Sequence, residues 1–351
     1  MVSETPNLAP ALLPERHPQY DLFICDVSDA VLKDVMPQME HPFYSLSKKP
    51  ETSIRRYEHN GQWLQVTPSV KGLATIYDKD VLIYCISQIM AKIKAGEPVS
   101  KRVRINSRDL LIFTNRGTAG KDYEALQEAI ERIRGTTIST NIRTGDEEQT
   151  DTFGLIDASS IRRKHGLDGR LISCEITLSD WVFNAIRHNE VLTLHRDYFR
   201  LRKPLERRMY ELARKHCGQQ DEWAISLDLL RKKTGSASSD KEFRRLVGDV
   251  CDENAKYSHM PDYSVRLDGN NVRFTNRKTM KALPSAEMTL FPTLDPETYN
   301  DARIVAPGYD VYYLEQEWRN FWLESGKPEL KNPDAAFIGF CKSRHNKKPM
   351  T

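Results

Sequence analysis

One segment constrains the fold of this chain most: residues 231–254 with the two leucines before them, LLRKKTGSASSDKEFRRLVGDVCDEN. It reads as a short helical segment, a turn rich in glycine and serine, and a second helix. Ser239, with Glu242 three positions later, predicts a capping box at the start of that helix. Apolar side chains at helical spacing allow one of its faces to be buried: Phe243, Leu246, Val247, Val250 and Cys251.

The opposite face of this second helix is basic. Lys241, Arg244 and Arg245 lie there and would point toward a polyanion. The residues that follow, YSVRLDGNNVRFTNRK, alternate like two strands joined at a Gly-Asn-Asn turn. Two helices followed by a basic hairpin are typical of a winged helix, which lays its second helix in the major groove of DNA. From these residues alone, an ordinary helical hairpin with a solvated charged face is the alternative.

The candidate DNA-binding residues have two expected roles. Arg244 is the best candidate for a contact to a base edge, followed by Lys241 and Arg245, because arginine can hold guanine through two hydrogen bonds. The other candidates are expected to bind phosphates, which positions the protein without reading sequence. They are Arg231, Lys232 and Lys233 before the turn, Arg266, Arg273, Arg277 and Lys278 on the hairpin, and Arg207 and Arg208 on an upstream helix. Each could instead be a solvated surface charge, and some of the upstream set must pair with Glu206 and Glu211.

Positive charge is concentrated in the same part of the chain. The whole chain carries a net charge of only +3, but residues 191–282 hold 20 Lys and Arg against 13 Asp and Glu. Residues 1–190 hold 24 against 26, and residues 283–351 hold 8 against 10. A basic segment between two slightly acidic ones is the electrostatic pattern expected of a phosphate-binding surface.

A similar order of elements is predicted earlier in the chain. A hairpin at Asn60-Gly61 is followed by three helical patterns and then by alternating, strand-like segments at 136–145 and 151–163. Three helices and a hairpin predict a first winged helix. Its third helix exposes Glu124, Gln127, Glu128 and Glu131, offset only in part by Lys121 and Arg132. Because such a surface repels phosphate, we expect the second winged helix to do most of the base reading.

The predicted fold class is α+β, with tandem winged-helix domains and a small C-terminal helical module. The expected organisation is a flexible tail at 1–20, a first winged-helix domain with a β lead-in at 21–190, a second at 191–282, a linker at 283–308, and an aromatic helical module at 309–351. The first domain is expected to serve dimerisation or backbone contacts. The aromatic module could be a packed helical hairpin or a protein-docking element.

No catalytic, cofactor-binding or metal-binding set stands out in the sequence. There is no His-x-His pair to accompany a DNA-cutting tyrosine, and GTAGKD at 117–122 lacks the spacing of a phosphate-binding loop. Six scattered cysteines without CxxC spacing indicate reduced core thiols. No apolar stretch approaches the ~20 residues of a membrane-spanning helix. We therefore expect a cytoplasmic protein that is not an enzyme and needs no cofactor.

Several long runs resemble the plasmid replication initiator proteins of the replication initiator A type. They are MPQMEHPFYSLSKKPETSIRRYEHNG at 36–61, GLATIYDKDVLIYCISQIM at 72–90 and LHRDYFRLRKPLERRMYELARKHCG at 194–218, together with PGYDVYYLEQEWRNFWLESG and NPDAAFIGFCKSR near the C-terminus. The resemblance implies tandem winged helices that bind repeated sequences (iterons) in duplex DNA at a plasmid origin. It also implies help in opening the origin and recruitment of the host replicative helicase and the host initiator.

Two alternatives stay open at this point. The chain could be a winged-helix transcriptional repressor of its own gene with no replication role. The resemblance also allows a homodimer in equilibrium with a DNA-binding monomer, with the first winged helix forming the contact. Ile138, Ile142 and Phe153 could supply an exposed edge for that contact, or they could be core residues.

Overall fold

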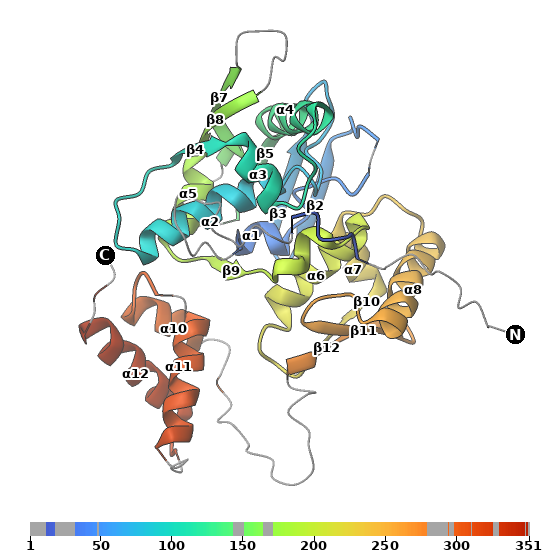
Figure 1. Ribbon diagram of the computed structural model, residues 1–351. Coiled ribbons are helices and arrows are strands. Elements are labelled where there is room, and N and C mark those ends of the chain that lie inside the picture. Colours follow the sequence, from blue (N-terminus) through green and yellow to red (C-terminus); the bar gives the residue numbers. More distant parts are fainter. Residues whose placement is uncertain are drawn as a thin grey trace, which may run out of the picture.

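Two bodies of helices and strands lie side by side in the computed structural model, and a group of three helices lies next to them (Figure 1). The structure describes residues 12–17, 32–47, 49–142, 151–163, 171–278, 294, 298–309, 311–325, 330–347 and 349.

The body formed by the later of the two stretches, residues 204–276, is a winged helix, which we call the second unit. Its elements are α6 (Pro204–His216), β10 (Glu222–Ser226), α7 (Leu227–Thr234), α8 (Asp240–Tyr257), β11 (Tyr263–Asp268) and β12 (Asn271–Asn276). The strands form an antiparallel sheet in the order β10-β12-β11. The hairpin turns at Gly269 and Asn270, so the predicted wing is confirmed.

Local sequence explains where the helices of the second unit begin and end. The Ser226 hydroxyl accepts a hydrogen bond from the Leu229 N–H at the start of α7, and Ser239 accepts one from the Glu242 N–H at the start of α8. Gly235 ends α7 with a φ of 67°, a left-handed conformation that glycine adopts without a Cβ penalty. The predicted inner face of α8 is confirmed, because Phe243, Val247, Val250 and Cys251 are buried and Leu246 packs against the same core.

The first unit repeats this topology. Its elements are α2 (Asp80–Lys94), β4 (Arg102–Asn106), α3 (Ser107–Phe113), α4 (Gly120–Gly135), β7 (Ile156–Arg163) and β8 (Leu171–Leu178). The sheet order β4-β8-β7 matches the order β10-β12-β11 element for element. The fold is therefore a tandem of winged helices, as the order of sequence patterns predicted.

The wing of the first unit lies later in the chain than predicted. The first segment expected to form it gives β5 (Thr137–Thr140). The second gives β6 (Asp151–Gly154), which pairs with β5, and then β7. However, β5 also pairs with β3 (Gln62–Thr67), and β3 with β2 (Arg55–His59), in a separate sheet of order β2-β3-β5-β6. The wing is the hairpin of β7 and β8, so the second predicted segment supplies one of its strands and the first supplies neither. The prediction was wrong for segment 136–145, because the apolar side of β5 packs inward: Ile138 lies opposite Val66, and both are fully buried.

Three buried clusters of hydrophobic side chains hold the molecule together. The first lies between Val35 and Val191. The second lies between Leu192 and Phe274, and four residues from earlier in the chain join it: Leu32, Met36, Met39 and Ile83. The short elements around this crossing are β1 (Lys33–Val35), which pairs with β9 (Val191–Thr193), and α1 (Met36–Glu40), α5 (Asp180–Arg187) and η1 (Arg196–Arg200). Ile138 and Ile142 belong to the first cluster, so they are core residues, and Phe153 stacks on Trp181 at its margin.

The third cluster lies within the C-terminal helices α10 (Thr298–Val305), α11 (Val311–Glu324) and α12 (Pro333–Lys347). Trp318 and Phe337 pack at its centre, with their ring centroids 5.5 Å apart. The predicted linker at 283–308 is wrong in its last part, because α10 begins at Thr298 and buries Ala302 and Ala306 in this cluster. Residues 283–293 of that linker lie outside the described residues.

The five cysteines within the described residues are buried thiols, as predicted: Cys85, Cys174, Cys217, Cys251 and Cys341. Cys25 lies outside the described residues. No helix of the described part of the chain is long and apolar enough to cross a membrane.

The predicted turn at Asn60-Gly61 gives a test of the fold. Both residues have positive φ values, 50° and 73°, which a two-residue hairpin of this type requires. We expect Gly61→Ala to lower the free energy of unfolding by about 1 kcal/mol, because alanine is strained at this φ. Gly248→Ala within α8 is the matched control: its Cβ would meet nothing within 4 Å, so stability should rise by about 0.5–1 kcal/mol. Urea unfolding of both variants measures the two signs, and equal effects would contradict the turn geometry.

Candidate nucleic-acid interface

The exposed face of α8 carries the basic residues that the sequence placed there. Lys241, Arg244 and Arg245 are all exposed, close to the N-terminal end of the helix. In a winged helix this end approaches the base edges, so the three side chains are positioned to contact DNA.

Arg244 joins the helix to the tip of the wing. Its guanidinium donates hydrogen bonds to the Gly269 carbonyl at 2.8 Å and to the Asn270 side-chain oxygen at 3.4 Å. Arg245 is held differently, because it pairs with Glu242 and Asp249 on the same helix, each at 2.7 Å. A DNA contact by Arg245 would have to break these pairs, whereas Lys241 has no ion-pair partner within 4.0 Å among the described residues.

The wing residues differ in their availability. Arg266 and Lys278 are exposed, and Arg266 lies opposite Arg273 across the two strands. Arg273 is half-buried and pairs with Glu222 at 2.5 Å. Arg277 donates hydrogen bonds to the carbonyls of Ser258 and Met260 and to the side chain of Asn254. Arg277 therefore closes the C-terminal end of α8 rather than facing solvent as a phosphate contact would.

The three basic residues before the turn also differ in whether they are available to DNA. Lys232 is exposed, while Arg231 pairs with Asp240 at 2.8 Å and donates to the Ser238 carbonyl. Lys233 is buried, and its ammonium lies 3.1 Å from a Glu40 carboxylate oxygen. The prediction of Lys233 as a DNA contact is wrong, because its charge is directed into the protein.

The prediction that Arg207 and Arg208 bind phosphates is also wrong, because both side chains are buried, with 3% of their surface exposed. Arg207 pairs with Asp80 of α2 at 2.8 Å and donates to the carbonyls of Phe199 and Leu201. Arg208 pairs with Glu211 at 2.9 Å and donates to the carbonyls of Gln38, Met39 and Lys233. Neither guanidinium can reach DNA from these positions.

These two arginines belong to a network of charges at the junction of the two units. At its centre the Lys79 ammonium lies 2.5 Å from Asp34 and 3.0 Å from Glu211, and all three side chains are fully buried. Burial raises the pKa of Asp34 to about 6, although the charge of Lys79 opposes the rise. Burial alone would also raise the pKa of Glu211, but Lys79 and Arg208 lower it. Glu211, with two cationic partners, is therefore the firmly ionised carboxylate of the pair.

The first unit presents a different surface. Glu124 and Glu128 are exposed on α4, and Arg132 faces inward to Asp78, with its two contacts at 2.8 and 2.9 Å. Arg132 therefore offsets little of the acidity of this helix. Exposed basic side chains lie on α4, at Lys121 and Arg134, and also on the sheet of this unit. On the sheet they are Arg104 of β4, Arg162 of β7, and Arg102 of β4, which pairs with Glu175 at 3.3 Å. The alternation of basic and apolar residues along β4 was a sequence signal for exposed arginines on this strand, and the sequence analysis did not use it.

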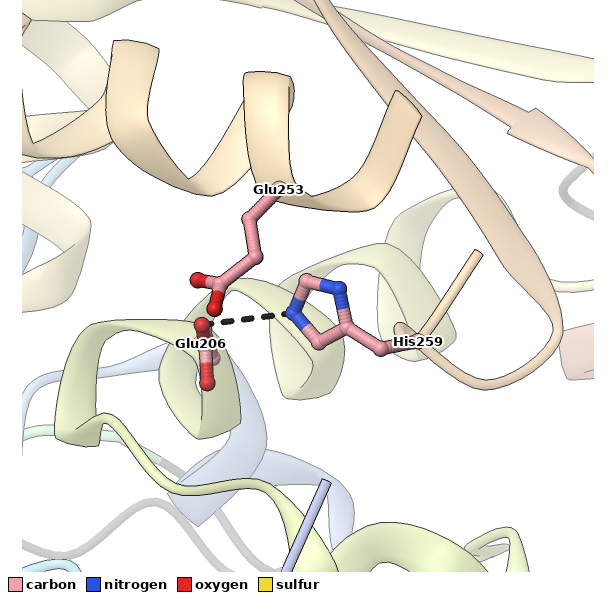
Figure 2. A group of neighbouring side chains, drawn as sticks. All are labelled: Glu206, Glu253 and His259. Atoms are coloured by element: carbon pink, nitrogen blue, oxygen red, sulfur yellow. Dashed lines mark hydrogen bonds and ion pairs between the residues drawn. The ribbon is translucent and has the colours of Figure 1, made fainter. Parts of the chain in front are cut away.

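A cluster of Glu206, Glu253 and His259 has the composition of a metal site (Figure 2). One ligand atom from each residue lies within 4.8 Å of the others, and the imidazole Nε2 of His259 is 3.2 Å from Glu206. However, the Lys203 ammonium is 3.4 Å from Glu206 and also contacts Glu253. Both carboxylates therefore have a cationic partner from the chain itself, and the cluster acts as an ionic clamp between α6 and α8.

Comparison with known proteins places this geometry among replication proteins. The family model described as replication initiator protein A matches residues 33–265. A protein of Wigglesworthia glossinidia brevipalpis named "Putative replication protein" is 36% identical over 251 residues, which is 71% of this chain and 90% of that protein. Domains 2 and 3 of RctB share the fold, with a TM-score of 0.51 at 12% identity over 68% of this chain and 97% of that one. The Pi initiator protein, solved in complex with iteron DNA, gives a TM-score of 0.41 at 17% identity over 57% of this chain and 90% of that one.

The burial of Lys233 gives a pH test. Burial alone would raise the pKa of Glu40, but Lys233 and Lys215 lower it to about 2. Such a carboxylate stabilises the fold above its unfolded pKa, and this stabilisation is lost as pH falls from 4.5 toward 2. We expect Glu40→Gln to lower the free energy of unfolding by about 1–3 kcal/mol at pH 7, because the Lys233 ammonium loses its partner.

Urea unfolding at a series of pH values measures the effect. The difference between wild type and Glu40→Gln should shrink as the pH falls through that window. Glu58→Gln, an exposed change on β2, is the control and should show little difference at any pH. A constant difference for Glu40→Gln across the window would show that its ionised form is not the stabilising species.

Proposed function

Because the chain belongs to the replication initiator protein A family, we propose that it starts plasmid replication by binding repeated duplex sequences at the plasmid origin. The observation that carries this proposal is the surface formed by α8 and the wing of the second unit. There Arg244 links the reading helix to the wing tip, and Lys241 stands exposed beside it. Helix and wing are thus presented to DNA as one surface.

The proposed contacts divide by chemistry. Arg244 and Lys241 read base edges in the major groove, where arginine and lysine recognise guanine. Lys232 on α7, Arg266 on β11 and Lys278 just after β12 are exposed and bind phosphates, which sets the register of the protein on the duplex. Arg245 and Arg273 contribute less, because each already has carboxylate partners.

In this proposal the first unit grips the phosphate backbone through its sheet rather than through α4. Arg104 and Arg162 are exposed there, and Arg102 contributes less because it pairs with Glu175. On α4 the exposed Glu124 and Glu128 oppose the two exposed cations of that helix and repel phosphate. The two winged helices would then have different tasks on one site: the second reads sequence and the first adds affinity that depends on salt.

Two large aromatic side chains are exposed on the C-terminal helices. Tyr313 is 53% and Phe321 is 58% exposed, and the Phe321 ring packs against Phe340 in a tilted arrangement at a centroid distance of 5.9 Å. We propose that this face recruits the host replicative helicase or the host initiator after origin binding. Exposed aromatic side chains favour protein contacts, because they bury a large apolar area with few rotatable bonds.

Footprinting of the purified chain on the DNA that flanks its own gene, at several salt concentrations, tests the proposal. Protection of several evenly spaced direct repeats, with affinity falling steeply as salt rises, is the expected result. Protection of a single palindrome over a promoter would support a repressor instead. No specific protection would overturn DNA reading by the second unit.

The reading surface predicts a difference between the two helices. Arg244→Ala should weaken binding to the origin repeat by about 1–3 kcal/mol and relax the preference at one base position. Lys121→Ala on α4 of the first unit is the matched control, since Lys121 is exposed on the corresponding helix, and it should change affinity little. Fluorescence anisotropy with labelled duplexes measures both. Equal losses would contradict the division between the units.

The docking role predicts a separation of DNA binding from plasmid maintenance. Deletion of residues 298–351 removes α10, α11 and α12 together, and we expect it to leave affinity for the origin repeat within about twofold while abolishing plasmid maintenance. The double variant Tyr313→Ser, Phe321→Ser tests the face without removing the helices. Normal maintenance by both variants would show that the C-terminal helices have no docking role.

A further inference from the structure

Residues 12–17 form a strap across the junction of the two units. They lie in the predicted flexible tail, yet they are hydrogen-bonded along most of their length. On the second-unit side, Leu12 bridges Leu201, and Leu13 exchanges hydrogen bonds with Arg200: its N–H donates to the Arg200 carbonyl and its carbonyl accepts from the Arg200 guanidinium, both at 2.8 Å. Glu15 pairs with Arg196 at 3.0 Å.

On the first-unit side, the strap holds the segment between α3 and α4. The Arg16 N–H donates to the Asn115 side-chain oxygen at 2.8 Å, and the Asn115 amide donates to the Pro14 carbonyl at 3.0 Å. His17 Nε2 lies 2.7 Å from the Arg116 carbonyl. Asn115 has a φ of 56°, which turns the chain so that its side chain faces the strap.

These contacts close a ring with the buried charges beneath them. From His17 the ring passes to Arg116, whose side chain pairs with Asp80 at 3.0 Å, and Asp80 pairs with Arg207 at 2.8 Å. Arg207 donates to the Leu201 carbonyl, and Leu201 returns to the strap at Leu12. Because the ring contains members of both units, it is complete only when the units keep their observed orientation.

We propose that this strap sets the spacing between the two DNA-contacting surfaces, and so makes the chain selective for the distance between the half-sites of one repeat. The inference rests on the proposed function, because it assumes that both units touch the same DNA. Rigidly linked contacts bind together only where their separation matches that of their targets. The strap, together with the buried charges, therefore adds a spacing requirement to the sequence preference of α8.

The test uses the full chain with two strap variants and two controls. Deletion of residues 1–17 removes the strap, whereas deletion of residues 1–11 keeps it. Asn115→Gly removes the side-chain contacts while allowing the positive φ, and Asn60→Gly is the same exchange at a φ of 50° far from the strap. Energy transfer between dyes placed at exposed Ser160 and Ala255 reports the orientation of the units without DNA.

Binding to the origin repeat, with its natural spacing or with one to three base pairs inserted between the half-sites, reports selectivity. We expect insertion to weaken binding of the wild type and of both controls by about tenfold or more. The strap variants should show a broadened dye-to-dye distance, weaker binding at natural spacing and a smaller loss on insertion. Strap variants that bind the origin repeat but match their controls in both measurements would overturn the spacing role alone. Absence of origin binding by the wild type would overturn the proposed function with it.

Discussion

The buried charges around Lys79 fix the relation between the two winged helices. Three ionisable side chains without solvent contact are costly to desolvate, and such a group is retained only when every charge has partners. Here β1 supplies Asp34, and α1 supplies backbone carbonyls that accept from Arg208. Lys79 directly precedes α2, and Asp80 is the first residue of that helix. The helix α6 supplies Arg207, Arg208 and Glu211. Loss of one partner would leave a buried charge without compensation, which typically costs about 3–5 kcal/mol. The second unit is therefore not an independent module beside the first; its leading helix completes the interior of their junction.

The sequence predicted well those features that depend on neighbours along the chain. The spacing of Phe243, Val247 and Val250 gave the buried face of α8, and Asn60-Gly61 gave the hairpin turn. Of the candidate DNA residues, those whose exposure follows from the helix and strand periods stayed on the surface: Lys232, Lys241, Arg244, Arg245, Arg266 and Lys278.

The failures arise where distant residues meet. Arg207 looks like a surface charge in its own helix, but its partner Asp80 lies 127 residues away, and the Lys233 partner Glu40 lies 193 residues away. No local pattern distinguishes a basic residue that becomes buried in the fold from one that stays on the surface, where it could contact DNA. The misplaced first wing has the same origin, since only the long-range pairing of Val66 with Ile138 shows that β5 belongs to another sheet. The number of basic residues in a segment is therefore larger than the number that are exposed and able to contact phosphate.

In the proposed complex, where Arg244 reads a base, its contact with the wing tip would change the entropy and enthalpy of binding. A free arginine on a helix surface loses several rotatable bonds when it settles on a base, a loss of about 0.5–1.5 kcal/mol for a side chain of this kind. Arg244 is already confined by the Gly269 carbonyl and Asn270, so much of that entropy is lost during folding and not on binding. The same contacts must be exchanged for those of the base, which makes the enthalpy of the complex sensitive to which base is offered. A correct base can replace both hydrogen bonds, and an incorrect one leaves the guanidinium better satisfied by its own wing.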